Sequence, residues 1–165
     1  RAYRSEYDFK ASVVFPANLY GPGDNLDPET SHVVPAIISK LLYAVREGLT
    51  EVTLWGDGTP TRDLLYVEDA AAGIVAAAER YEDIEPMNLG TGVETGVSEV
   101  AGLIAQLCGY RGKIVYDGTK PNGQPRRVLD TAKAARVINW RAETSLRDGL
   151  ARTIEWVDAN LAARR

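Results

Sequence analysis

The chain has 165 residues, of which 45% are hydrophobic and 25% charged, shares that are typical of one globular domain and exclude a disordered or collagen-like chain. The 19 basic and 23 acidic side chains give a formal charge of −4, which disfavours nucleic-acid binding, and no apolar run is long enough to cross a membrane. With one cysteine, Cys108, and one histidine, His32, the chain has no disulfide framework and no metal site built from several such residues, and we expect a cytoplasmic location.

Short apolar runs alternate with helical patterns along the chain, which predicts an α/β domain. Residues 1–8 have the pattern of the end of a helix. The apolar run 11–15 (ASVVF), closed by Pro16, predicts a buried strand. A polar loop rich in Gly, Pro, Asp and Asn follows from 17 to 31, and loops of this length are often functional.

Apolar residues at three- and four-residue steps predict a helix from about Val33 to a stop at Gly48. The further expected strands cover 51–55, 62–67, 87–89 and 113–116. The further expected helices cover 68–81, 131–138, 146–161 and a segment from a cap at Ser98 to about Gly109. A second polar loop occupies 117–127. The connections are long enough to hold a ligand, but the chain lacks the regular units of a complete doubly wound sheet.

The best-known cofactor and nucleophile motifs are absent. No G-x-G-x-x-G or G-x-x-x-x-G-K-[ST] segment occurs, and no G-x-S-x-G elbow is present. The segment 90–96 (GTGVETG) has the wrong glycine spacing for a dinucleotide fingerprint, so we interpret it as a strand-to-helix turn. Function must therefore be sought among isolated polar and aromatic residues in the loops.

His32 is one such residue, because it stands at the end of the long polar loop and at the start of a predicted helix. The partial positive charge of a helix N-terminus suits an imidazole that faces an anionic group. A surface histidine that merely caps the helix is the alternative.

Aromatic and basic residues follow in the later loops. Trp55 offers a flat stacking face, and Arg62 a bidentate fork for phosphate. Lys120, Arg126 and Arg127 could clasp a pyrophosphate. The alternatives are a core tryptophan, a surface ion pair and a solvated basic loop.

Several segments of the chain resemble one enzyme family. The run 13–40, VVFPANLYGPGDNLDPETSHVVPAIISK, strongly resembles the second half of extended short-chain dehydrogenase/reductase enzymes of the NAD-dependent epimerase/dehydratase family. Further matching blocks follow in the same order at 54–71, 87–101 and 109–130, with a closing helix around Trp156. The S-H-V-V-P and K-P-N-G-x-P-R blocks are most similar to the GDP-L-fucose synthase branch.

The resemblance implies that part of the enzyme lies outside this chain. The family carries its cofactor fingerprint, its Tyr-x-x-x-Lys pair and a catalytic cysteine on the N-terminal side, and Cys108 does not match that cysteine in position. We therefore expect residues 1–165 to be the C-terminal substrate-binding domain, with a few strands and helices that belong to an absent N-terminal Rossmann half. Alone, this chain is expected to be inactive.

The matched positions imply roles for ten residues. Pro16, Ala17, Asn18 and Leu19 match the segment beside the nicotinamide ribose, and His32 matches a general acid that also borders the cofactor. Lys40, Trp55, Arg62, Asn122 and Arg127 match substrate-binding positions. In this branch an arginine is usual at position 40, an aspartate is common at 122 and a lysine is common at 127.

The implied reaction has an epimerisation and a reduction. A base removes a proton beside the 4-keto group and an acid returns one to the opposite face, which inverts C3 and then C5; NADPH then reduces the ketone. The implied cofactor is NADP, with NAD as the alternative, and the intact enzyme is expected to be a homodimer that binds a GDP-linked sugar. The alternatives are a dTDP- or UDP-sugar epimerase or dehydratase, and a nucleotide-sugar binding module without chemistry.

Overall fold

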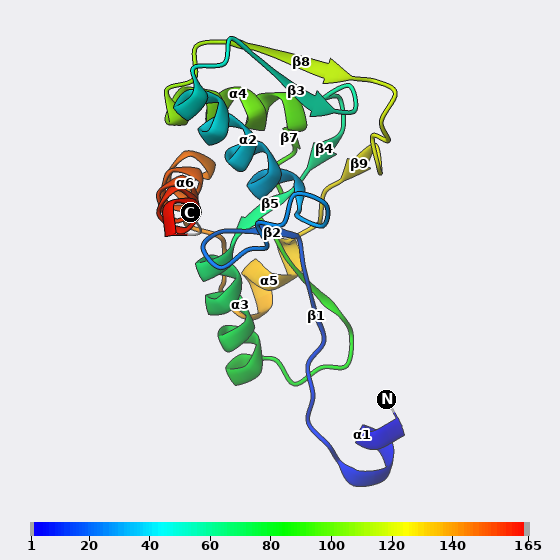
Figure 1. Cartoon of the computed structure of the whole chain (residues 1–165). Helices are drawn as coiled ribbons and strands as arrows, with labels where there is room; N and C mark the ends of the chain where they lie inside the picture. The colour runs from blue at the N-terminus through cyan, green and yellow to red at the C-terminus, as the bar shows by residue number, and fades with distance from the viewer. Residues whose placement is uncertain (1, 164–165) are drawn as a thin grey trace.

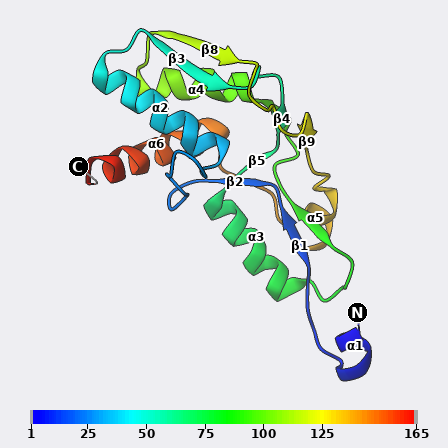
Figure 2. The ribbon, with the colours of Figure 1, turned by 45° about the vertical axis from the view of Figure 1, so that its right-hand side comes forward.

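The computed structural model describes residues 2–163, which fold into an elongated mixed α/β arrangement (Figure 1). Three helices pack together near one end: α2 (Val33–Glu47), α4 (Val97–Cys108) and α6 (Leu146–Ala163). Two helices lie toward the other end: α3 (Val67–Arg80) and α5 (Ala132–Val137). The short helix α1 (Ala2–Tyr7) lies beyond them at the far end of an extended segment, as both ribbon views show (Figures 1 and 2).

The strands within residues 2–163 form four small sheets rather than one large one. Three of these sheets are parallel pairs: β1 (Val14–Pro16) with β6 (Met87–Leu89), β2 (Asn18–Tyr20) with β5 (Leu64–Tyr66), and β3 (Glu51–Trp55) with β8 (Lys113–Asp117). In the fourth sheet, β4 (Thr61–Arg62) lies between β7 (Thr95–Gly96), to which it is antiparallel, and β9 (Arg126–Arg127), to which it is parallel. The strand pairs thus join segments that are far apart in the sequence.

Two hydrophobic cores correspond to the two ends. The larger one buries the apolar faces of α2, α4 and α6 together with side chains of β3 and the fully buried Tyr20 and Tyr66. The smaller one lies between α3, α5 and β6, where Trp140 packs against the helix glycine Gly73. The elements that carry the loops 21–32, 56–60 and 118–125 are therefore anchored on packed structure.

The predicted α/β class is confirmed, and most helices lie where they were expected. The helix at 33–47 ends as predicted, with Gly48 in the left-handed conformation at φ 66°. The prediction of a Ser98 cap was wrong: α4 begins at Val97, its N-cap is Gly96, and no side chain caps it.

The strand boundaries differ more from the prediction. The strand expected over 11–15 begins at Val14 and includes Pro16, and part of the predicted loop forms β2. The extended run 62–67 is divided at Asp63 between β4 and β5, and the loop 117–127 ends in β9. Each of these short strands is defined by a partner distant in sequence, and local patterns do not carry that information.

Strand β1, near the N-terminus, has one edge without a strand partner among the described residues. Among the described strands β1 pairs with β6 alone, and Val13 and Phe15 are exposed. That this segment belongs to the sheet of an absent N-terminal half stays a prediction. No helix within residues 2–163 is long and apolar enough to span a membrane.

A buried carboxylate, that of Asp63, connects four segments of the chain. Asp63 is 1% exposed, and its oxygens accept hydrogen bonds from Thr91 N (2.9 Å), Thr91 Oγ1 (2.6 Å) and Gly92 N (3.1 Å). Its carbonyl oxygen accepts from Asn18 N (3.1 Å), and its own N–H donates to Arg127 O (2.9 Å). One residue thereby holds the starts of β2 and β5, the turn after β6 and the end of β9.

We predict that Asp63→Ala lowers the free energy of unfolding by about 2–3 kcal/mol, because three hydrogen bonds to a buried carboxylate are lost. The donors of the half-buried Thr91 and the exposed Gly92 can then turn to water, which limits the loss. Asp63→Asn should lower the free energy of unfolding less, because one side-chain oxygen remains as an acceptor. Some loss is still expected, because the new N–H₂ group faces an N–H donor. Urea unfolding measures both changes. Glu155→Gln, at an exposed carboxylate of α6, is the control and should change stability little; an Asp63→Ala chain as stable as this control would contradict the assigned role.

Candidate functional site

Two cavities meet at Arg62 and Val33, which line both. The first has a volume of about 690 Å³ and the second about 360 Å³. The first is lined by seven of the ten residues singled out from the sequence: Pro16, Ala17, Asn18, Leu19, His32, Arg62 and Arg127. The second is lined by Lys40, Trp55, Arg62 and Asn122. The structure thus brings all ten residues into one continuous region, with Arg62 at the junction.

The first cavity is walled by the backbone that links β1 to β2. Ala17 N donates to Leu89 O (2.7 Å) and Asn18 N donates to Asp63 O (3.1 Å), so this segment is held by both neighbouring strands. It follows the carboxyl end of β1, which is parallel to β6. Ligands of open α/β sheets bind at such strand ends.

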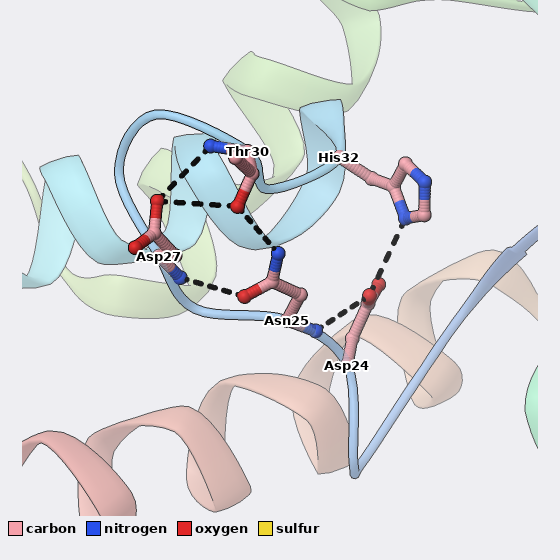
Figure 3. A network of polar contacts seen from close by, with 5 residues as sticks. All are labelled: Asp24, Asn25, Asp27, Thr30 and His32. Carbon is pink, nitrogen blue, oxygen red and sulfur yellow. Dashed lines mark hydrogen bonds and ion pairs between the residues drawn. The ribbon is translucent and has the colours of Figure 1, made fainter.

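His32 reaches the first cavity from the N-cap position of α2. Its side chain makes no capping hydrogen bond, so the capping alternative is not supported. Instead its Nδ1 atom lies 3.4 Å from Oδ1 of Asp24, and its side chain is 77% exposed (Figure 3). The imidazole is therefore presented to the cavity and to solvent, with one ring nitrogen facing a carboxylate.

Trp55 forms an exposed aromatic platform at the edge of the second cavity. It ends β3 and is 62% exposed, which rules out the alternative of a core tryptophan. The Nζ atoms of Lys40 and Lys120 each lie 5.7 Å from its ring centroid. Lys40 Nζ also donates to Thr53 O (3.1 Å), which fixes its position on α2 relative to β3. A flat ring flanked by two cations suits a planar, anionic ligand.

Arg62 connects the two cavities. Its Nη1 donates to the carbonyl oxygens of Thr61 (2.7 Å) and Gln124 (2.6 Å), so neutral groups hold the guanidinium at these contacts. Burial of the residue is intermediate, and Arg62 precedes Asp63, whose side chain points into the protein. Because these acceptors are uncharged, the guanidinium keeps its full positive charge and can still pair with a phosphate.

The side chain of Asn122 joins two loops. Its Oδ1 accepts a hydrogen bond from Asp57 N (2.8 Å) and lies against Gly56, where a Cβ atom would overlap it. Hydrogen bonds from the hydroxyl and the backbone N–H of Thr59, with the Asn122 side chain as a smaller cause, hold the pKa of Asp57 below its usual range. The structure thus gives Asn122 a role in fixing the turn beside Trp55; its predicted contact with substrate stays a prediction.

The basic loop divides into three different environments. Arg126 Nε pairs with Glu94 Oε2 at 2.9 Å, and the Thr61 hydroxyl, followed by this ion pair, lowers the pKa of Glu94. Arg127 lines the first cavity, and Lys120 contacts Trp55. All three residues are exposed, so a solvated basic loop stays the alternative to a pyrophosphate clasp.

Sequence reasoning missed Asp24, which the structure adds to the region: it contacts His32 across eight positions of an irregular loop. Lys120 was singled out, but its contact with Trp55, 65 residues away, was not expected. The composition of both loops indicated a ligand site, but no spacing rule links these partners. Among residues 2–163 no group of three or more His, Cys, Asp and Glu side chains could hold a metal ion.

Comparisons with known proteins agree on one family. The family model described as "NAD dependent epimerase/dehydratase family" matches residues 1–90. GDP-L-fucose synthase 1 of Arabidopsis thaliana is 41% identical over 164 residues, which cover 99% of this chain and 50% of that protein. The chain therefore spans about half the length of the curated relatives it matches.

Solved structures give the same picture. A GDP-L-fucose synthetase from Naegleria fowleri bound to NADP has a TM-score of 0.84 and 30% identity, over 92% of this chain and 47% of that one. A UDP-glucose 4-epimerase from Thermotoga maritima, solved with UDP-glucose, has a TM-score of 0.84 and 31% identity, over 97% and 50%. In both, the matched part is about half of a longer enzyme.

We predict that Gly56→Ala frees the turn beside Trp55. The new Cβ would overlap Asn122 Oδ1, and φ at this position is +80°, which strains any other residue. The Asp57 amide should then exchange its hydrogen at least about fivefold faster, the effect of losing a hydrogen bond of net strength near 1 kcal/mol. Gly118→Ala is the matched control, since nothing lies within 4 Å of its added Cβ. Equal exchange rates at Asp57 in the two variants would refute this role of Asn122.

Proposed function

The chain belongs to the NAD-dependent epimerase/dehydratase family, and we propose that it forms the nucleotide-sugar-binding part of a GDP-4-keto-6-deoxymannose 3,5-epimerase/4-reductase. The observation that carries this proposal is the junction at Arg62 of two cavities, one with an exposed tryptophan between two lysines and the other with the single histidine. Such a pair can bind a nucleotide and hold its sugar beside a proton-transfer group.

The second cavity would bind the nucleotide. Trp55 offers its face for stacking, and Lys40 and Lys120 place positive charge at the two phosphates. Arg62 would take a phosphate or sugar oxygen at the cavity junction, since its other contacts are to neutral carbonyls. Lys40 supplies charge but not the bidentate geometry of an arginine.

The first cavity would receive the sugar and the edge of the cofactor. Its volume of about 690 Å³ is that of an ordinary small-molecule site. The segment 16–19 follows the carboxyl end of β1 and lines this cavity, so its residues fit one side of a nicotinamide ribose. NADPH, when bound, supplies the hydride; most of its contacts would come from an N-terminal half.

His32 would return the proton during epimerisation. Removal of a proton beside the 4-keto group leaves an enolate, and an acid on the opposite face completes the inversion of the carbon. The imidazole lines the same cavity as the 16–19 segment, which puts it within the region that the sugar would occupy. The reaction needs further groups that this chain does not contain, so we expect no turnover by these 165 residues alone.

A second candidate is an enzyme that acts on another nucleotide sugar. The UDP-glucose 4-epimerase whose structure was solved with UDP-glucose matches this fold with the same TM-score as the NADP-bound GDP-L-fucose synthetase. Trp55 would stack on any base, so the base itself must be discriminated by experiment. A binding module without chemistry would bind the nucleotide as well, but would have no use for His32.

We predict that GDP quenches the tryptophan fluorescence of the chain more strongly, and at lower concentration, than UDP or dTDP. Trp55 is exposed, whereas Trp140 is 8% exposed and Trp156 is partly buried, so the signal should come from Trp55. Trp55→Phe should abolish most of the response. Arg62→Ala should weaken GDP binding by about 10- to 100-fold, because hydrogen bonds to charged groups are worth about 1.5–3 kcal/mol.

Lys133→Ala is the control for this titration, since Lys133 lies near Tyr81, away from both cavities. A preference for UDP or dTDP would favour the second candidate. No saturable response to any of the three nucleotides would reject nucleotide binding by this chain.

We predict that His32→Gln, in the full-length enzyme that contains this chain, leaves GDP binding unchanged and slows proton return by about 10²–10⁴-fold, the usual contribution of general acid catalysis. Deuterium incorporation at C3 and C5 of the sugar from D₂O measures the step without the reduction. A glutamine variant that exchanges both positions at the wild-type rate would remove His32 from the mechanism.

A further inference from the structure

We propose that Asp24 is the positioning residue of His32, whose Nδ1 hydrogen it accepts so that Nε2 is the atom that exchanges protons in the cavity. The role in catalysis rests on the proposed function; the pairing of the two side chains does not. Nothing in the sequence pattern indicated Asp24, which lies eight positions before His32 in the polar loop.

The geometry sets the two ring nitrogens in different surroundings. Nδ1 lies 3.4 Å from Asp24 Oδ1, whereas Nε2 points away from the carboxylate in Figure 3. The Asp24 side chain is 17% exposed and that of His32 is 77% exposed, and both line the first cavity. The separation is long for a hydrogen bond, as catalytic contacts often are without substrate.

A second hydrogen bond, independent of His32, holds the Asp24 side chain in place. Its Oδ1 also accepts the backbone N–H of Asn25 at 2.8 Å, which fixes the carboxylate relative to the main chain. The carboxylate therefore has a defined direction toward His32.

The loop that carries both residues is internally bonded (Figure 3). Asn25 accepts from Asp27 N (3.0 Å) and donates to Thr30 Oγ1 (2.9 Å). Asp27 Oδ1 in turn accepts from Thr30 N (3.1 Å) and Glu29 N (2.9 Å). These contacts connect the Asp24 end of the loop with the residues that enter α2, so the distance between Asp24 and His32 is preset.

A fixed tautomer is what proton return requires. When imidazolium gives its Nε2 proton to the enolate carbon, the electron pair of the enolate forms the C–H bond, the 4-keto group is restored and neutral His32 remains. With Nδ1–H held by Asp24, that neutral ring has its lone pair on Nε2 and can be reprotonated there. Without Asp24 the neutral ring can carry its hydrogen on Nε2, where it no longer accepts a proton.

The tautomer can be measured directly because His32 is the single histidine of the chain. In the 165-residue chain labelled with ¹⁵N-histidine, two-bond ¹H–¹⁵N spectra distinguish the two ring nitrogens at the alkaline end of a pH titration. We expect Nδ1–H to dominate in the wild-type chain. Asp24→Ala should lower the Nδ1–H to Nε2–H ratio about fivefold, the effect of losing a hydrogen bond of ordinary net strength.

Two further variants keep the result interpretable. Asp24→Asn can preserve the contact with the Asn25 N–H and so keep the loop folded, and it should shift the ratio in the same direction but less. Glu29→Gln removes one negative charge from the same loop without a contact to the ring, and it should leave the ratio unchanged.

The wild-type spectrum alone can overturn the proposal: a neutral ring with its hydrogen on Nε2 would refute the role of Asp24 whatever the variants do. An unchanged ratio in a folded Asp24→Ala chain would do the same. Neither result bears on nucleotide binding, which the fluorescence titration tests separately.

Discussion

The site depends on the buried carboxylate of Asp63. It accepts three hydrogen bonds from Thr91 and Gly92, while its backbone ties Asn18 to Arg127. Strands β2, β5 and β9 and the turn after β6 come from distant parts of the sequence and would otherwise have only two- or three-residue ladders to hold them. Since successive side chains of an extended chain face opposite sides, burying Asp63 turns its neighbour Arg62 toward the cavities. Asp63 thus stabilises the junction of the two cavities, and the preceding residue, Arg62, provides its positive charge.

A second constraint keeps the loops around Trp55 rigid without burying them. Strands β3 and β8 run parallel, and each leads into an Asp-Gly-Thr turn in which the aspartate accepts from the N–H and hydroxyl of the threonine: Asp57 with Thr59, and Asp117 with Thr119. In both cases the threonine hydroxyl is the main reason why the aspartate pKa is lowered. These exposed turns place the Trp55 platform and the lysine-bearing loop next to each other.

Features that depend on residues close together in the sequence were predicted correctly, and features that depend on distant residues were not. Helix α2 and its Gly48 stop were predictable because apolar spacing and a left-handed glycine act within a few residues. Strands β2 and β9 were missed because their partners are far away in the chain. His32, Trp55, Arg62 and Arg127 were candidates from residue type and position, the resemblance supplied the other six site residues, and the structure brings all ten together around two cavities. Neither residue spacing nor the family resemblance pointed to Asp24, because its contact with His32 depends on the conformation of an irregular loop.

If the proposed function holds, this chain alone binds a nucleotide at the junction of the two cavities. Backbone and indole ¹H–¹⁵N spectra of the labelled chain, recorded during addition of GDP, test this binding. We expect shifts at the Trp55 indole and at the amides around Lys40, Arg62 and Lys120, with α1 and α5 unaffected. Shifts that are absent from this region, or that centre on another surface, would contradict it.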